Sequence, residues 1–140
     1  MKNNGPSKTW RILIVDDEQD IARLAAAFIG ELGFDVKSAK DGGEALMIIE
    51  SFKPDIVVSD IHMSEIDGDE LYRKTVVTTP SYAKRFVFMT GSGIDLRLSQ
   101  FLNDTGCVIL TKPFDFQELA NVIGRKIEEM QRGRITEDEN

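Results

Sequence analysis

Four largely apolar runs in this 140-residue sequence each end in a residue that could take part in a reaction. Asp16 and Asp17 follow the run "ILIV", and Asp60 follows "IVVS". Thr90 follows "FVFM", and Lys112 follows "VILT". If the chain folds so that these run ends meet, three carboxylates, a hydroxyl and an ammonium would share one site.

This set of side chains is suited to phosphoryl transfer. Carboxylates that lie close together repel, so a cation must join them or their pKa values must rise. Oxygen ligands favour Mg²⁺, which takes one or two protein carboxylates and keeps several waters. The metal and an ammonium neutralise phosphoryl oxygens, and one carboxylate can be the nucleophile that forms an acyl phosphate. Each residue alone has an ordinary explanation as a turn, helix cap, strand end or solvated charge, so the hypothesis depends on their convergence.

Alternating strands and helices would position these residues. Short apolar or alternating runs predict five strands, over residues 11–15, 34–39, 55–60, 85–90 and 107–111. Helical spacing and capping signals predict five helices, over residues 21–32, 41–52, 67–75, 94–103 and 115–130. This order predicts an α/β fold, a doubly wound parallel sheet with helices on both faces. Such sheets place their sites at the carboxyl ends of the strands.

Side-chain spacing also predicts how two of the helices pack. The first helix is expected to bury one face and to end at Gly33; that face comprises Ile21, Leu24, Ala25, Phe28, Ile29 and Leu32. The segments "DGGE" (41–44) and "DFQE" (115–118) have the form of capping boxes that open helices. The last helix is expected to bury Leu119, Val122, Ile123, Ile127 and Met130.

Composition limits the class of protein. The net charge of −7 argues against a nucleic-acid or anionic-membrane partner, and no apolar run is long enough to span a bilayer. Cys107, the only cysteine, predicts a core position and no disulfide framework. We expect a cytoplasmic protein with one domain over residues 10–131, a disordered tail over 1–9 and an acidic tail over 132–140.

The sequence resembles the response-regulator receiver domain of two-component signalling. The resemblance covers Arg11 to Met130 and rests on the segments "ILIVDDEQD", "PDIVVSDIHMSEIDGDEL", "FMTGS" and "LTKPF". It implies a flavodoxin-like (βα)5 fold with strand order 2-1-3-4-5. It also implies that Asp60 accepts a phosphoryl group from a phosphohistidine, on a sensor histidine kinase or a histidine phosphotransfer domain.

The same resemblance implies roles for the neighbouring residues. Asp17, Asp60 and the backbone carbonyl of His62 would bind Mg²⁺, and Asp16 would hold a metal-bound water. Lys112 and Thr90 would stabilise the phosphoryl group. The peptide bond between Lys112 and Pro113 is expected to be cis. The domain would be a switch that catalyses its own phosphorylation and dephosphorylation, not a metabolic enzyme.

Two positions depart from the family's usual pattern. Ser64 stands where proline is common, and Ile109 stands where the family has its switch aromatic, so output must use another route or change less. No part of the sequence is left for an output domain, so we expect output through an unidentified protein partner. A stand-alone regulator and the receiver of a hybrid sensor kinase remain equally open.

His62, the only histidine, has two open interpretations. Its imidazole could lie at the rim of the site and affect the attack of water on the acyl phosphate, or it could be a solvated loop residue. Two rival classes of protein have different sequence requirements. A haloacid-dehalogenase-type phosphatase would need Asp-x-Asp after the first strand and a cap domain, and the segment Asp16-Asp17-Glu18 does not fit. A pseudo-receiver should lack Asp17, Asp60 or Lys112, all of which are present, but the missing aromatic at Ile109 keeps this class open.

Overall fold

The computed structural model describes residues 8–63, 66–91 and 96–139. Five strands and five helices alternate along the chain, with one short 3₁₀ helix before the fourth strand. The strands are β1 Arg11–Val15, β2 Asp35–Ala39, β3 Ile56–Asp60, β4 Phe86–Thr90 and β5 Val108–Thr111. The helices are α1 Gln19–Glu31, α2 Gly42–Phe52, α3 Gly68–Thr78, η1 Pro80–Lys84, α4 Leu96–Thr105 and α5 Phe116–Glu139.

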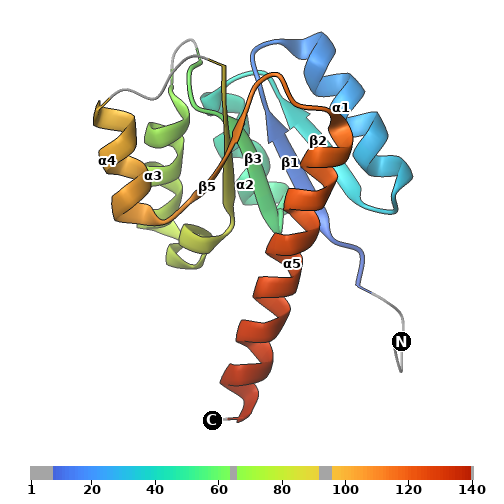
Figure 1. The fold of residues 1–140 in the computed structure, drawn as a ribbon, viewed down its shortest axis with the longest axis vertical. Coiled ribbons are helices and arrows are strands. Elements are labelled where there is room, and N and C mark those ends of the chain that lie inside the picture. The colour runs from blue at the N-terminus through green and yellow to red at the C-terminus, as the bar shows by residue number, and fades with distance from the viewer. Residues whose placement is uncertain (1–7, 64–65, 92–95, 140) are drawn as a thin grey trace.

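The strands form one parallel sheet in the order β2-β1-β3-β4-β5, which confirms the predicted topology. Helices α1 and α5 cover one face, and α2, α3 and α4 cover the other (Figure 1). Every residue of β3 and β4 is buried, because these strands lie inside the sheet with helices on both sides. All five strand carboxyl ends therefore meet at one edge.

Local signals in the sequence explain several helix ends. The Oδ1 atom of Asp41 accepts a hydrogen bond from the backbone N–H of Glu44 at the start of α2. At the start of α5, Asp115 and Glu118 exchange side-chain to backbone hydrogen bonds of 2.8 and 3.2 Å, a complete capping box. Gly33 follows α1 with φ of 105°, a conformation that favours glycine.

The packing of α1 differs from the prediction. Ala22, Ala25 and Ile29 are its buried residues, whereas Leu24 is 60% exposed. Ile21 and Leu32 are also exposed, so the predicted face was wrong at three of its six members. The small alanines let α1 lie close to the sheet, and the larger side chains of Ile21 and Leu24 stay on the exposed part of the helix surface.

Several predicted boundaries also differ from the structure. Helix α3 continues to Thr78 and is followed by η1, which the sequence did not predict. Helix α5 continues to Glu139, so the predicted tail from residue 132 is helical, and the end of α5 projects past the sheet (Figure 1). Lys8, placed in the predicted disordered tail, contacts the Asp55 carboxylate at 2.7 Å. Residues 1–7 and Ser64 lie outside the described residues.

Candidate functional site at the carboxyl edge of the sheet

The sheet brings the predicted site residues to one edge. Asp60 is the last residue of β3, and Asp16 directly follows β1, the strand beside it. Thr90 ends β4 on the other side of β3, where Asp60 is paired with Met89. Lys112 follows β5, and its backbone N–H donates to the carbonyl oxygen of Thr90 at 2.7 Å. Parallel register therefore places residues at the ends of three other strands, β1, β4 and β5, around Asp60.

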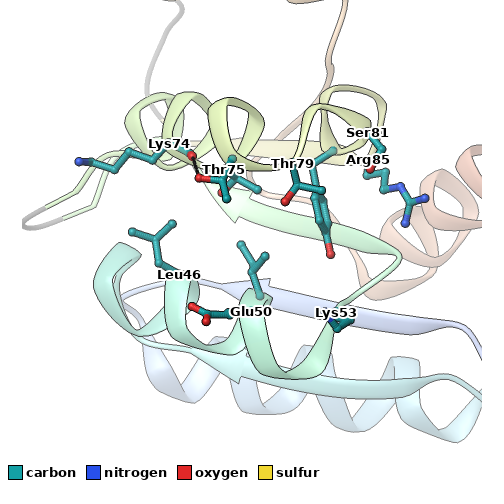
Figure 2. A pocket seen from close by; sticks show the side chains of 11 residues that line it. Leu46, Glu50, Lys53, Lys74, Thr75, Thr79, Ser81 and Arg85 are labelled. Atoms are coloured by element: carbon teal, nitrogen blue, oxygen red, sulfur yellow. Dashed lines mark hydrogen bonds between the residues drawn. The ribbon is translucent and has the colours of Figure 1, made fainter.

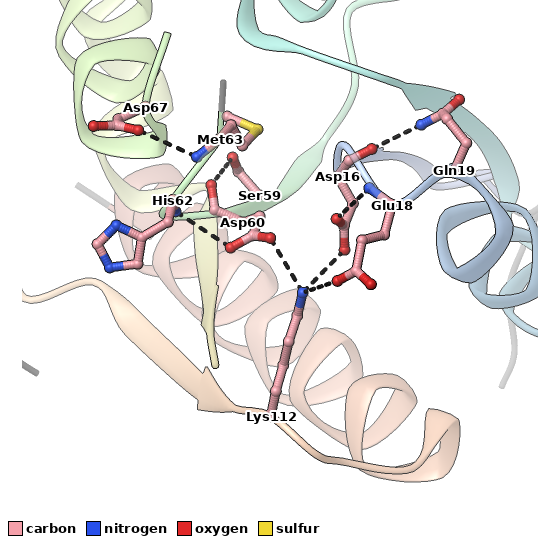
Figure 3. Close-up of polar contacts among 9 residues, drawn as sticks. All are labelled: Asp16, Glu18, Gln19, Ser59, Asp60, His62, Met63, Asp67 and Lys112. Carbon is pink, nitrogen blue, oxygen red and sulfur yellow. Dashed lines mark hydrogen bonds and ion pairs between the residues drawn. The ribbon is translucent and has the colours of Figure 1, made fainter. Parts of the chain in front are cut away.

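The ammonium of Lys112 lies between the carboxylates (Figure 3). Its Nζ is 3.1 Å from Oδ2 of Asp60 and 3.2 Å from Oδ2 of Asp16. Glu18 adds a third, more exposed carboxylate at 3.6 Å. The peptide bond between Lys112 and Pro113 is cis, as predicted. The geometry thus joins residues almost one hundred positions apart into one ion cluster.

Burial and charge oppose each other at Asp60. Burial raises the pKa of the Asp60 carboxyl above its ordinary value, although the Lys112 charge and hydrogen bond lower it. The charge of Asp16 adds to the rise. For Lys112, burial lowers the pKa, but the carboxylates of Asp60 and Asp16 outweigh it, and the net shift is upward. The ammonium is therefore held charged, and the acidic cluster favours a further cation.

The described residues between β3 and α3 make several hydrogen bonds close to Asp60. The backbone N–H of His62 donates to Oδ1 of Asp60 at 3.3 Å, and that of Met63 donates to Oδ1 of Asp67 at 3.2 Å. Gly68 donates its N–H to the carbonyl oxygen of Ile61 at 2.9 Å. A Cβ at Gly68 would overlap the Asp60 carbonyl oxygen, so only glycine lets α3 begin this close.

Three carboxylates could hold a metal ion. Oxygen atoms of Asp16, Asp17 and Asp60 lie within 4.8 Å of one another, and Asp17 is exposed while the other two are buried. Such a set of hard oxygen ligands with an open, solvent-facing side fits Mg²⁺, which keeps several waters. The acidic edge thus fits the cation that the sequence predicted.

The side chain of His62 is exposed, and in Figure 3 it points away from the Lys112 ammonium. Thr90 is buried at 1% exposure, on the strand next to Asp60. No role was predicted from the sequence for Glu18, although Glu18 contacts Lys112. Asp69, a buried carboxylate in the first turn of α3, was also missed, because an acidic residue near a helix start usually needs no further explanation.

A cavity of about 570 Å³ lies between α2 and α3, at the opposite edge of the sheet (Figure 2). Lys74 and Arg85 line it, and each has a carboxylate 3.9 Å away, on Glu70 and Asp55. The Tyr82 hydroxyl, also in the lining, donates to the carbonyl oxygen of Pro54. These three polar groups have partners within the protein, so they do not mark a particular ligand.

The fold and the acidic edge define a class of protein, an α/β domain whose sheet edge carries a buried carboxylate in a cluster that could hold a cation. Comparison with known families gives the family directly: the model of the response regulator receiver domain matches residues 12–124. The chain belongs to this family, whose members are signalling switches of two-component systems. The resemblance stated from the sequence is therefore confirmed.

Relatives with different architectures carry this domain. The chain is 33% identical over 119 residues to the sensor kinase CckA of Brucella abortus, covering 84% of this chain and 12% of the relative. It is 32% identical over 112 residues to the transcriptional regulatory protein TrcR of Mycobacterium tuberculosis, covering 78% and 42%. The chain thus spans less than half the length of these two relatives.

Solved structures agree with the fold. A CheY-like receiver domain protein from Methanospirillum hungatei JF-1 superposes with a TM-score of 0.81 at 28% identity, covering 90% of this chain and 99% of that one. NtrX from Brucella abortus gives 0.82 at 27% identity, covering 95% and 30%. Among the described residues, no helix is both long and apolar enough to cross a membrane.

Proposed function

We propose that Asp60 is the phosphoacceptor of this receiver domain and that it takes its phosphoryl group from a phosphohistidine of a sensor kinase or histidine phosphotransfer domain. The observation that carries the proposal is the position of the Lys112 ammonium, 3.1 Å from Asp60 at the carboxyl edge of the sheet. A buried carboxylate beside a fixed cation is poised to attack phosphorus, because the cation offsets charge on the phosphoryl oxygens.

The transfer replaces one bond to phosphorus by another. A carboxylate oxygen of Asp60 attacks phosphorus, the P–N bond to the donor imidazole breaks, and the imidazole nitrogen keeps the bonding electrons. Lys112 stabilises charge on the phosphoryl oxygens, and Thr90 donates a hydrogen bond from the neighbouring strand. Asp16, Asp17, Asp60 and the His62 carbonyl would hold Mg²⁺, which supplies charge neutralisation when bound.

A protein partner is proposed to read the phosphorylated state. The relatives include a kinase and a transcriptional regulator, so both kinds of architecture are compatible with this domain. Ile109, three residues before Lys112, is half-buried and packs against the core beneath α2, α3 and α4. Since an isoleucine offers neither a ring nor a hydroxyl, the output surface is proposed to change by another route or to change less.

Incubation with acetyl phosphate and Mg²⁺, followed by intact mass spectrometry, tests the proposal. The wild type should gain one phosphoryl group, and Asp60→Asn should gain none. Asp55→Asn is a matched control, because Asp55 is as buried as Asp60 but lies just before the other end of β3. A wild type that gains no phosphoryl group would contradict the assignment, as would an Asp60→Asn variant that still gains one.

A further inference from the structure

A second cluster of charges joins α3 to α4, outside the carboxylate site. Oδ2 of Asp69 accepts a hydrogen bond from Arg73 at 3.0 Å and another from Arg97 at 2.6 Å. Arg73 belongs to the same helix as Asp69, whereas Arg97 lies in the first turn of α4. The Asp69 side chain is 6% exposed, so the carboxylate depends on these partners in place of water.

The two arginines keep Asp69 ionised. Burial alone would raise the pKa of the Asp69 carboxyl, but the hydrogen bonds and charges of Arg73 and Arg97 outweigh burial and hold that pKa below its ordinary value. Arg73 also lies over the ring of Phe101 on α4, with 5.1 Å between its Cζ atom and the ring centroid. Helices α3 and α4 are therefore connected by an ion pair and by a cation–π contact.

Asp69 is also connected to the loop that follows Asp60. Gly68 directly precedes Asp69, packs against the Asp60 carbonyl, and donates its N–H to Ile61. The side chain of Asp67 accepts from the backbone of Met63 in the same loop. A displacement of the loop after β3 must therefore displace the first turn of α3, where Asp69 lies.

Helix α4 is connected to the same site along the chain. It follows β4, whose last residue is Thr90, and its residues Leu98 and Phe101 are buried against the core. Helices α3 and α4 both follow strands that end at the carboxyl edge, and the hydrogen bond between Asp69 and Arg97 connects the first turns of these two helices. The contact measures 2.6 Å, so a shift of α4 by the 1–2 Å typical of switching proteins would lengthen it or require the Arg97 side chain to change conformation.

We propose that Asp69 is a positioning residue that holds the first turn of α4 in its resting place through Arg97, and that this contact opposes phosphorylation of Asp60. The proposal rests on the function proposed above. In this proposal the pair is present in the unphosphorylated state and lost in the phosphorylated one, so a variant without the pair loses stabilisation of the first state alone. By linkage, the chain then reaches the phosphorylated conformation at lower cost and binds a phosphoryl mimic more tightly.

Beryllofluoride, a mimic of the phosphoryl group, provides the test. Its apparent Kd in Mg²⁺ is measured for the wild type and for Arg97→Gln, which should fold because the Arg97 side chain is 60% exposed. An ion pair of this partly exposed kind predicts that the variant binds about threefold more tightly. Asp69→Asn, which keeps the shape of the side chain and removes its charge, should shift the Kd in the same direction.

A control separates coupling from stability. Lys74→Gln breaks the contact of Lys74 with Glu70, which lies wholly within α3, and should leave the Kd unchanged. A merely structural role for Asp69 predicts a lower free energy of unfolding in Arg97→Gln with an unchanged Kd. That result, or weaker binding by the variant, would overturn the inference. Failure of the wild type to bind beryllofluoride would instead refute the proposed function, and the inference with it.

Discussion

Lys112→Met tests the electrostatics of the carboxyl edge, because methionine keeps most of the side-chain length and removes the ammonium. The ammonium now contacts Asp16 and Asp60, whose side chains are 1% and 9% exposed. Breaking a fully buried ion pair costs about 3–5 kcal/mol. The Lys112 side chain is 20% exposed, so water partly replaces it, and we expect the free energy of unfolding to fall by about 2 kcal/mol at neutral pH.

The loss of stability in Lys112→Met should be larger at neutral pH than in acid. The pKa of Asp60 is already raised in the folded protein, and removal of Lys112 raises it further. A carboxyl whose folded pKa exceeds its unfolded value binds more protons in the folded state, so stability falls as pH rises through that window. The variant should therefore resemble the wild type below the ordinary Asp pKa of 3.8 and diverge from it toward neutral pH.

Urea unfolding in EDTA, followed by the fluorescence of Trp10, measures this difference. Lys74→Met is the control, because it makes the same change of net charge and disrupts only a 3.9 Å pair between half-exposed side chains. Lys74→Met should lower the free energy of unfolding by less than about 0.5 kcal/mol. A Lys112→Met variant that matches this control at neutral pH, or whose loss is equally large in acid, would refute the reasoning.

Three further predictions concern neighbouring residues. Gly68→Ala should lower the free energy of unfolding by about 1–3 kcal/mol, because its Cβ meets backbone at Asp60, whereas Gly30→Ala has open space in α1 and should be neutral or stabilising in the same urea titration. Arg97→Gln should lower the free energy of unfolding by about 1 kcal/mol at neutral pH. This loss should shrink as pH falls below 3.8 and through the lowered pKa of Asp69, because the carboxylate that Arg97 pairs with becomes protonated. A loss of the same size in acid would contradict a stabilising ion pair between Arg97 and Asp69. If the His62 imidazole affects hydrolysis, His62→Ala should change the lifetime of the phosphorylated protein, and an equal decay rate between about pH 5.5 and 8 would leave His62 a solvated loop residue.

The strands and the site edge could be predicted because their signals are local and strong. The runs that became β1, β3, β4 and β5 are short and apolar, as buried parallel strands require, and polar residues end them. The alternation of strands and helices predicts a parallel sheet, which places Asp16, Asp60 and Lys112 at one edge, and the strand order that makes them neighbours was implied by the family resemblance. The distances between them follow from strand register, which no local pattern encodes.

The face of α1 could not be predicted from spacing alone. Its apolar residues cover more than half of the helix surface, so Leu24 and Ala25 were equally compatible with the core, and close packing against the sheet selected the alanine. The role of Asp69 was hidden for another reason. Arg97 lies 28 residues away on another helix, and only the tertiary structure brings its guanidinium to the Asp69 carboxylate.

The central claim, that Asp60 is the phosphoacceptor, is tested most directly by locating the phosphoryl group. Borohydride reduces an acyl phosphate on aspartate to homoserine, which tandem mass spectrometry can place in the chain. After incubation with acetyl phosphate and Mg²⁺, we predict homoserine at position 60, and none when Mg²⁺ is withheld. Homoserine at position 16 or 17, or at no position in a fully folded sample, would contradict the account.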